Sequence, residues 1–224
     1  GGTFNPIHLG HLRAAEEVRQ ALELDRVLFI PSAQPPHKHP DREDPIAEAE
    51  RRFEWVARAI ADQKDFETDR IEIDREGPSF LVDTLEALRE REVGAKLIFI
   101  VGEDAFAEMG DWRAPERLFE LTDLAVMTRP PGQLRNLEER IPKIVRGRFD
   151  YSDGGRTARH QQAGTKIRLV PITALDISSR EIRRMLRNDR SIRYLVPETI
   201  REEIEQCGVY GPPVPGSGAM TRGR

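Results

Sequence analysis

The stretch that decides the fold is the first eleven residues, Gly1-Gly2-Thr3-Phe4-Asn5-Pro6-Ile7-His8-Leu9-Gly10-His11. Paired glycines allow positive φ or the close approach of a ligand, and Pro6 suits the start of a helix. A helix beginning near Ile7 would place His8 and His11 about 60° apart on one face of its first turn. That turn carries unpaired N–H groups and the positive end of the helix dipole. The stretch therefore predicts a polyphosphate site.

The spacing alone leaves two alternatives open. A glycine turn before a helix is common, so either histidine could serve packing only. The histidines could also bind a metal, but zinc takes three or four ligands. The remaining histidines and the cysteine are scattered along the chain: His37, His39, His160 and Cys207. We therefore expect no dedicated metal site.

Composition bounds the class of protein. The chain has 224 residues, of which 38% are hydrophobic and 33% charged, which is typical of a soluble globular domain. A net charge of −4 argues against a nucleic-acid partner. One cysteine excludes an internal disulfide and suits a reducing compartment, so we expect a cytoplasmic protein. No apolar run approaches the ~20 residues of a membrane span.

Helical and strand patterns alternate along the chain. Apolar periodicity predicts helices over residues 9–24, 45–62, 80–92, 134–146 and 197–206. Short apolar or alternating runs predict strands over 27–30, 66–73, 96–101, 124–127 and 167–172. The polar stretch 151–166 reads as a mobile loop, and residues 211–224 as a disordered tail. This order predicts a single α/β domain over 1–210, built as a doubly wound parallel sheet with a helical C-terminal part. A βαβ unit also needs a strand ahead of Gly1.

Several candidate site residues follow predicted strands. The strand at 96–101 runs into Gly102 and Asp104, where α/β sheets place ligands, although Asp104 could equally be a helix N-cap. The tandem prolines Pro35-Pro36 predict an extended loop that presents His37 and Lys38, or simply a surface loop. Trp112 lies in a polar loop, where it could stack on a flat ring or pack into the core.

A second helix start resembles an anion site. Ser178 and Glu181 form a capping box, and the hydroxyls of Ser178 and Ser179 with Arg183 could surround a phosphate. Glu181 argues against this reading, because its carboxylate competes for the same donors. The alternative is a well-capped helix and nothing more.

These blocks together resemble the nucleotidylyltransferase superfamily, and within it the bacterial nicotinate-nucleotide adenylyltransferases. The resemblance spans residues 1 to about 210. Its motifs are Gly1 to His11, Pro35-Pro36-His37-Lys38, Gly77-Pro78-Ser79-Phe80 with Asp83-Thr84-Leu85, Val101-Gly102-Glu103-Asp104, Trp112, Arg129-Pro130, Ile177-Ser178-Ser179 with Ile182-Arg183, Tyr194-Leu195-Val196-Pro197, and Gly208-Val209-Tyr210. The His-x-Gly-His element alone indicates only the superfamily, whereas the ordered combination is specific.

The resemblance implies a Rossmann-like fold and AMP transfer from ATP to nicotinate mononucleotide, giving deamido-NAD and pyrophosphate in NAD biosynthesis. It implies catalytic roles for His8, His11 and Arg183. It implies ATP contacts by Gly1, Gly2, Thr3, Phe4, His8, His11, Gly102, Asp104, Ser178, Ser179 and Arg183. It implies nicotinate-nucleotide contacts by His37, Lys38, Phe80, Leu81 and Trp112.

The chain departs from the family pattern at three places. Asn5 replaces the usual Asp, Arg180 replaces a Thr, and Phe80-Leu81 replaces Tyr-Thr near the pyridine site. The last departure bears on the choice between an acid and an amide acceptor.

The expected chemistry needs no general base. A phosphate monoester has a second pKa near ~6 and is already largely ionised at neutral pH. The histidines are therefore expected to orient ATP and stabilise charge. Without an acidic cluster, Mg²⁺ is expected to arrive on the ATP phosphates. A non-catalytic nucleotide-binding module would have no need for both histidines and Arg183, and the sequence leaves homo-oligomerisation open.

Overall fold

The computed structural model describes residues 1–36, 45–128 and 136–211. Its α-helices are α1 (Leu9–Ala21), α2 (Ala49–Ala59), α3 (Leu81–Arg91), α4 (Glu103–Glu108), α5 (Pro115–Leu121), α6 (Ser179–Arg187) and α7 (Glu198–Gln206). Its strands are β1 (Val27–Phe29), β2 (Phe66–Thr68), β3 (Ile98–Gly102), β4 (Asp123–Thr128), β5 (Phe149–Ser152), β6 (Thr157–His160) and β7 (Lys166–Pro171).

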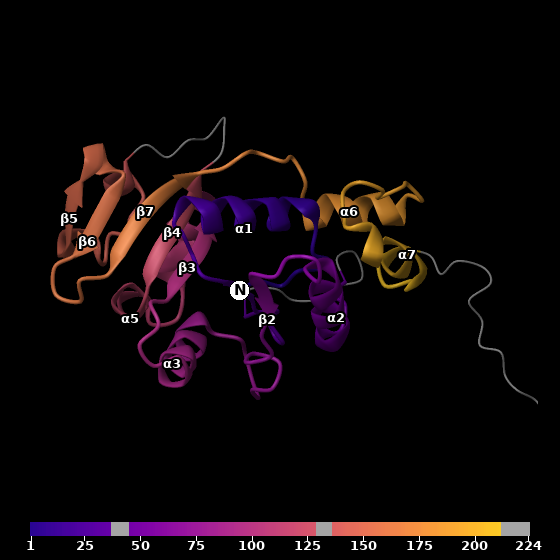
Figure 1. Ribbon diagram of the computed structural model, residues 1–224, viewed down its shortest axis with the longest axis horizontal. Coiled ribbons are helices and arrows are strands. Elements are labelled where there is room, and N and C mark those ends of the chain that lie inside the picture. The colour runs from indigo at the N-terminus through magenta and orange to yellow at the C-terminus, as the bar shows by residue number, and fades with distance from the viewer. Residues whose placement is uncertain (37–44, 129–135, 212–224) are drawn as a thin grey trace, which may run out of the picture.

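The strands form two sheets. Strands β1 and β2 pair in parallel, and the larger sheet has the order β3-β4-β7-β6-β5. In the larger sheet β3, β4 and β7 are parallel, while β6 is antiparallel to both β5 and β7. Helices cover both faces, with α1 on one side and α3 and α5 on the other (Figure 1). This is the expected Rossmann-like arrangement of a mostly parallel sheet between helices.

The apolar side chains form cores on both sides of the larger sheet. One core packs α3, α4 and α5 against β4 and β7, and a small cluster of Val18, Ala125 and Val170 packs α1 on the opposite face. A third core joins β1 and α2 to the C-terminal helices α6 and α7. The C-terminal helices therefore close around the start of the chain.

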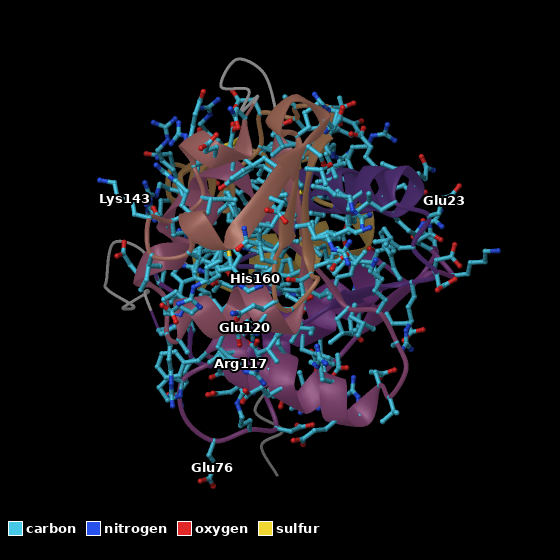
Figure 2. The ribbon with its side chains drawn as sticks, turned by 90° about the vertical axis from the view of Figure 1, so that its left-hand side faces the viewer. Glu23, Glu76, Arg117, Glu120, Lys143 and His160 are labelled. Carbon is cyan, nitrogen blue, oxygen red and sulfur yellow. The ribbon has the colours of Figure 1, made fainter. Side chains whose placement is uncertain are left out.

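The prediction of a mobile loop over 151–166 is wrong. Most of this stretch belongs to the antiparallel hairpin β5–β6, which extends the sheet (Figure 2). The hairpin buries Phe149, Ala158 and His160. Ala158 and His160 contribute little hydrophobicity, so the sequence does not show the alternation of buried and exposed residues that is typical of a strand.

Two element boundaries also differ from the prediction. Helix α2 begins at Ala49 instead of Pro45, because Asn5 binds the Pro45 carbonyl and the Ala47 N–H from across the molecule. Strand β2 ends at Thr68, and residues beyond Asp69 turn instead of continuing to residue 73.

The predicted helix over 134–146 is wrong within the described residues. Residues 136–148 form only short 3-10 turns, Leu137–Glu139 and Arg146–Arg148, and Pro142 cannot donate within a helix. No helix in the described ranges is long and apolar enough to span a membrane.

Candidate active site

The glycine turn leads into α1 through two stacked imidazoles. Phe4 adopts a left-handed backbone with φ of 47°, and His8 is the N-cap of α1. The His8 and His11 ring centroids lie 3.6 Å apart with the planes 23° from parallel. The backbone N–H of His8 donates to His11 Nδ1 at 3.3 Å. The proton of a neutral His11 is therefore on Nε2, where it can be donated to an oxyanion.

The carbonyls of the turn are bound by side chains from other elements. Arg52 Nη1 donates to the Thr3 carbonyl at 2.7 Å, and Arg183 Nη1 donates to the Asn5 carbonyl at 2.7 Å. Ser179 Oγ donates to the Pro6 carbonyl at 2.9 Å. Because N–H and C=O point in opposite directions across a trans peptide, binding the Thr3 carbonyl directs the Phe4 N–H to the other side of the turn.

These contacts join the two predicted phosphate-binding motifs, although they are more than 170 residues apart in sequence. The structure buries Arg183, with one guanidinium nitrogen on the turn, so α6 is docked directly on the start of the chain.

Helix α6 begins at the predicted N-cap, Ser178. The Ser178 hydroxyl accepts the Glu181 N–H at 3.2 Å. The Glu181 carboxylate pairs instead with Arg184 at 2.7 Å, and this hydrogen bond holds the pKa of Glu181 below its ordinary value. The competition expected between Glu181 and an anion is therefore reduced, because the carboxylate is engaged by Arg184.

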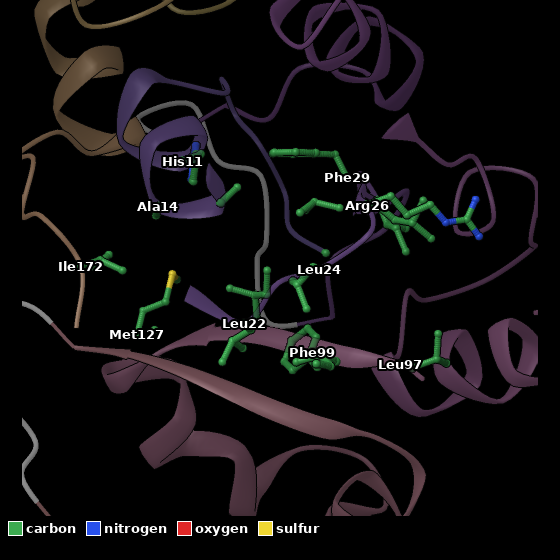
Figure 3. A pocket seen from close by; sticks show the side chains of 18 of the residues that line it. His11, Ala14, Leu22, Leu24, Arg26, Phe29, Leu97, Phe99, Met127 and Ile172 are labelled. Carbon is green, nitrogen blue, oxygen red and sulfur yellow. The ribbon is translucent and has the colours of Figure 1, made fainter. Parts of the chain in front are cut away.

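A cavity of about 960 Å³ adjoins the turn. His11 and Ala14 of α1 face it from one side, and Phe99 of β3 lies across from them (Figure 3). Its walls include nine of the residues predicted from the sequence to bind substrates: Gly1, Phe4, His8, His11, Leu81, Gly102, Asp104, Ser178 and Ser179. The sequence motifs therefore converge on one hollow at the carboxyl end of β3.

The remainder of this cavity lies between β1 and β3 and is largely apolar, although charged residues such as Arg26, Glu92 and Lys96 also line it. Its lining there comes from α1, β1, α3 and β3, with Leu22, Leu28, Leu88 and Ile98 among the side chains. This part continues away from the histidines, so the full volume should not be assigned to substrates.

Gly102 and Asp104 follow β3 at the edge of the cavity. Gly102 is the N-cap of α4, which begins at Glu103. Asp104 lies within the first turn with an exposed side chain. The N-cap alternative for Asp104 is therefore wrong, and its carboxylate is open to solvent.

Two of the predicted acceptor residues, Phe80 and Trp112, are aromatic side chains that pack on the core beside α3. Trp112 packs edge-on against Phe99 with centroids 6.3 Å apart, and the Arg113 guanidinium lies 4.6 Å from the Phe80 ring centroid. Both Phe80 and Trp112 are partly exposed and pack on the same core cluster. His37 and Lys38 lie outside the described residues.

The sequence pattern predicts Ser79 as the N-cap of the helix over 80–92, but Ser79 does not cap α3. Its hydroxyl instead accepts the backbone N–H groups of Ala33 and Gln34 at 3.0 and 3.3 Å. The helix N-cap is Phe80, which makes no side-chain capping bond. The first turn of α3 therefore keeps backbone donors available beside Phe80.

Asn5 is a buried junction behind the turn. Its Nδ2 donates to the Pro45 carbonyl at 2.9 Å. Its Oδ1 accepts from the Ala47 N–H and from the Tyr210 hydroxyl. An aspartate could reproduce the two accepted bonds but could not donate to Pro45.

Sequence reasoning missed Arg52 and assigned no role to Tyr210. Helix α2 buries Arg52 together with Trp55, Val56 and Ala59. An arginine on the apolar stripe of a helix is the sequence signal that could have indicated a buried arginine. The apolar periodicity of residues 45–62 also predicts that Phe53 points inward, but Phe53 is half-buried beneath Arg70. Tyr210 belongs to the Gly208-Val209-Tyr210 block of the family resemblance, which gave it no role at the turn.

Among the residues that the structure describes, no group of three or more His, Cys, Asp or Glu side chains could hold a metal ion. Around the glycine turn and the start of α6, the polar groups are imidazoles, hydroxyls and backbone donors. Such groups suit an anionic ligand.

Comparison with known proteins agrees with this geometry. The cytidylyltransferase-like family model matches residues 1–185. A Trichlorobacter lovleyi protein named "Probable nicotinate-nucleotide adenylyltransferase" is 46% identical over 215 residues, covering 95% of this chain and 97% of the relative. A Syntrophotalea carbinolica protein of the same name is 43% identical over 210 residues, covering 94% of each.

A solved structure shares the fold. The Plasmodium falciparum nicotinic acid mononucleotide adenylyltransferase complexed with NaAD superposes with a TM-score of 0.69 at 15% identity, covering 93% of this chain and 94% of that chain. The chain therefore belongs to the cytidylyltransferase-like family, among the nicotinate-nucleotide adenylyltransferases.

Proposed function

We propose that this chain transfers the adenylyl group of ATP to the phosphate of nicotinate mononucleotide, forming deamido-NAD and releasing pyrophosphate. The observation that carries the proposal is the docking of α6 on the glycine turn. Ser179 and Arg183 bind carbonyls of the turn that precedes His8 and His11. Two helix N-termini thereby meet at one cavity, and helix N-termini favour phosphate groups.

In this proposal ATP lies along the turn and the start of α6. Its phosphates contact backbone donors of Gly1 to Phe4, the imidazoles of His8 and His11, and the start of α6 with Ser178, Ser179 and Arg183. Gly102 and Asp104 line the nucleoside end. A divalent cation bound to the phosphates accompanies ATP, and we propose Mg²⁺ with mostly water ligands.

The acceptor lies on the side of α3. Trp112 stacks on the pyridine ring, Phe80 and Leu81 supply the start of α3, and His37 and Lys38 approach the acceptor phosphate. An oxygen of that phosphate attacks the α-phosphorus as the bond to the bridging oxygen of pyrophosphate breaks. The nucleophile is already ionised, so His8 and His11 stabilise charge on the α-phosphate and on the leaving group without taking a proton.

The test measures pyrophosphate release from ATP with nicotinate mononucleotide, nicotinamide mononucleotide and phosphopantetheine in separate reactions. We expect release with nicotinate mononucleotide and its loss when EDTA removes divalent cations. A preference for nicotinamide mononucleotide would make that nucleotide the substrate, and we would attribute the preference to Phe80-Leu81, which replace the usual Tyr-Thr. Binding of ATP without release in all three reactions would contradict the proposal and favour a non-catalytic module.

A further inference from the structure

Arg52 is a buried cation held by carbonyl oxygens. Its side chain enters the core from α2 with 1% of its surface exposed. Nε donates to the Ala47 carbonyl at 2.8 Å, and Nη1 to the Thr3 carbonyl at 2.7 Å. Nη2 donates to the carbonyls of Ser32 at 2.7 Å and Ala33 at 3.3 Å. One guanidinium therefore binds three separate segments of backbone.

Two of these segments belong to opposite sides of the proposed reaction. Thr3 lies in the turn assigned to ATP. Ser32 and Ala33 lie in residues 31–36, which we call the acceptor loop because they follow β1 and directly precede the proposed acceptor residues His37 and Lys38. The other side of this loop is tied to α3, because Ser79 Oγ accepts the Ala33 and Gln34 N–H groups. A continuous series of hydrogen bonds therefore connects the ATP turn with the residue before Phe80. It passes from Thr3 through Arg52 and the acceptor loop to Ser79.

The arrangement depends on the shape of an arginine. Among the described residues Arg52 has no carboxylate partner, although buried cations are usually paired. Its planar fork presents five donors in fixed directions. A lysine places three donors on one atom, and one nitrogen cannot reach carbonyls on three sides of a guanidinium.

We propose that Arg52 is a positioning residue that fixes the ATP turn relative to the acceptor loop, and so sets the alignment of the α-phosphate with the attacking phosphate. The inference rests on the proposed function. Misplacing reacting groups by about 1 Å can lower the rate about 10²-fold. Each substrate would still meet its own contacts, so affinity should change much less than turnover.

The kinetic test compares Arg52→Lys with Arg58→Lys. Arg58 lies on the same helix but is exposed and binds Glu203 and the Thr199 carbonyl, away from the site. For Arg52→Lys we expect kcat per folded molecule to fall about 30- to 100-fold, with the KM of each substrate within about threefold of the unaltered protein. Arg58→Lys should leave kcat and both KM values unchanged. A purely structural Arg52 would lower the folded fraction and leave kcat per folded molecule intact, which would overturn the inference.

A second measurement does not depend on turnover. Hydrogen exchange of the unaltered protein is followed with and without a non-hydrolysable ATP analogue. The link predicts slower exchange at Ala33 and Gln34, whose N–H groups bind Ser79, as well as in residues 1–5. Ser32 is not used as a readout, because its N–H binds the Gly2 carbonyl directly. Arg52→Lys or Arg52→Gln should remove the slowing at Ala33 and Gln34 and leave it in residues 1–5. Slowing in 1–5 without slowing at Ala33 and Gln34 in the unaltered protein would overturn the inference. If no pyrophosphate is released with nicotinate mononucleotide, the proposed function fails, while this exchange experiment still decides the role of Arg52.

Discussion

His11 combines a fixed tautomer with a place at the mouth of the cavity. Its Nδ1 accepts the His8 N–H, so Nε2 is the nitrogen that can donate to a phosphate oxygen. The partner imidazole stacks on it at 3.6 Å, which limits the rotation of the ring. Both features favour a group that is oriented before the substrate arrives.

Replacing His11 should therefore affect turnover more than folding. For His11→Ala we expect kcat to fall by about two to three orders of magnitude, the scale of one lost oxyanion donor. The measurement is steady-state pyrophosphate release, with circular dichroism to establish that the variant is folded. Turnover near that of the unaltered protein in a folded variant would contradict the assignment.

Tyr210 gives the fold a dependence on alkaline pH. Burial raises the pKa of its phenol well above the ordinary value, and the hydroxyl donates to Asn5. Above about pH 10 the unfolded chain releases this proton and the folded chain keeps it. The unfolded state then binds fewer protons, so stability falls as pH rises.

Tyr210→Phe should remove that dependence. We expect the free energy of unfolding of the unaltered protein to fall by up to about 1.4 kcal/mol per pH unit above pH 10 from this residue alone. At pH 7 the variant should be about 1 kcal/mol less stable through the lost hydrogen bond. Urea unfolding between pH 8 and 11 measures both effects, and parallel curves for the two proteins would show that Tyr210 does not titrate on unfolding.

Among the elements, the β5–β6 hairpin pairs with β7 and buries one large side chain, Phe149, in the core. The Phe149 ring packs edge-on against Phe119 and His160, with centroids 5.8 and 5.1 Å apart. His160 is itself tied to the turn that follows β6, because its Nδ1 accepts the Gln162 and Ala163 N–H groups. The hairpin lies at the sheet edge opposite β3, away from the proposed substrate site.

Phe149→Ala should separate stability from activity. We expect a loss of about 3–5 kcal/mol, as for other large-to-small core substitutions, with KM for both substrates unchanged at temperatures where the variant is folded. Chemical unfolding and kinetics measure the two effects, and Val93→Ala, at an 87% exposed apolar residue, is the control. A raised KM would mean that the hairpin also shapes the site.

Predictions from the sequence were most accurate for elements whose local signals are not overridden by contacts with distant residues. The sequence correctly predicted β4, β7, the Ser178 cap and α7, because each has continuous apolar runs or capping residues. The predicted start of α2 is wrong because Asn5 binds the backbone of Pro45 and Ala47 from far along the chain. The predicted cap at Ser79 is wrong because its hydroxyl binds the backbone of Ala33 and Gln34. The hairpin was missed because its buried face is short and partly polar.

At the scale of the whole molecule, the apolar part of the cavity separates β1 from β3. In β1 the Val27 N–H and the Phe29 carbonyl bond to residues around β2. The alternate residues Leu28 and Ile30 therefore direct their backbone groups toward the cavity. Gly2 already pairs in parallel with Pro31, donating to Ile30 and accepting from Ser32 at 3.0 and 2.9 Å.

This geometry gives a register to the strand that the sequence led us to expect ahead of Gly1. A residue joined to the Gly1 amino group would lie opposite Phe29 and continue the parallel ladder. Adding about five apolar residues there should raise the free energy of unfolding by at least ~2 kcal/mol, the scale of one buried aliphatic side chain. Denaturant unfolding measures the gain, and a matched extension containing lysine and proline should give none. Equal stability of the two extensions would refute the expected strand.

The sequence by itself determined the family, the α/β class and the two motifs that we propose bind phosphate, because these depend on short runs of residues whose chemistry is local. Only the tertiary structure decided how the motifs are held. Arg52, Arg183 and Ser179 bind turn carbonyls from helices far along the chain, and Tyr210 reaches Asn5 across 205 positions. Such partners share no periodicity or spacing with the turn they support. Their pairing arises from the packing of α2, α6 and the C-terminal segment around the turn, which no local pattern encodes.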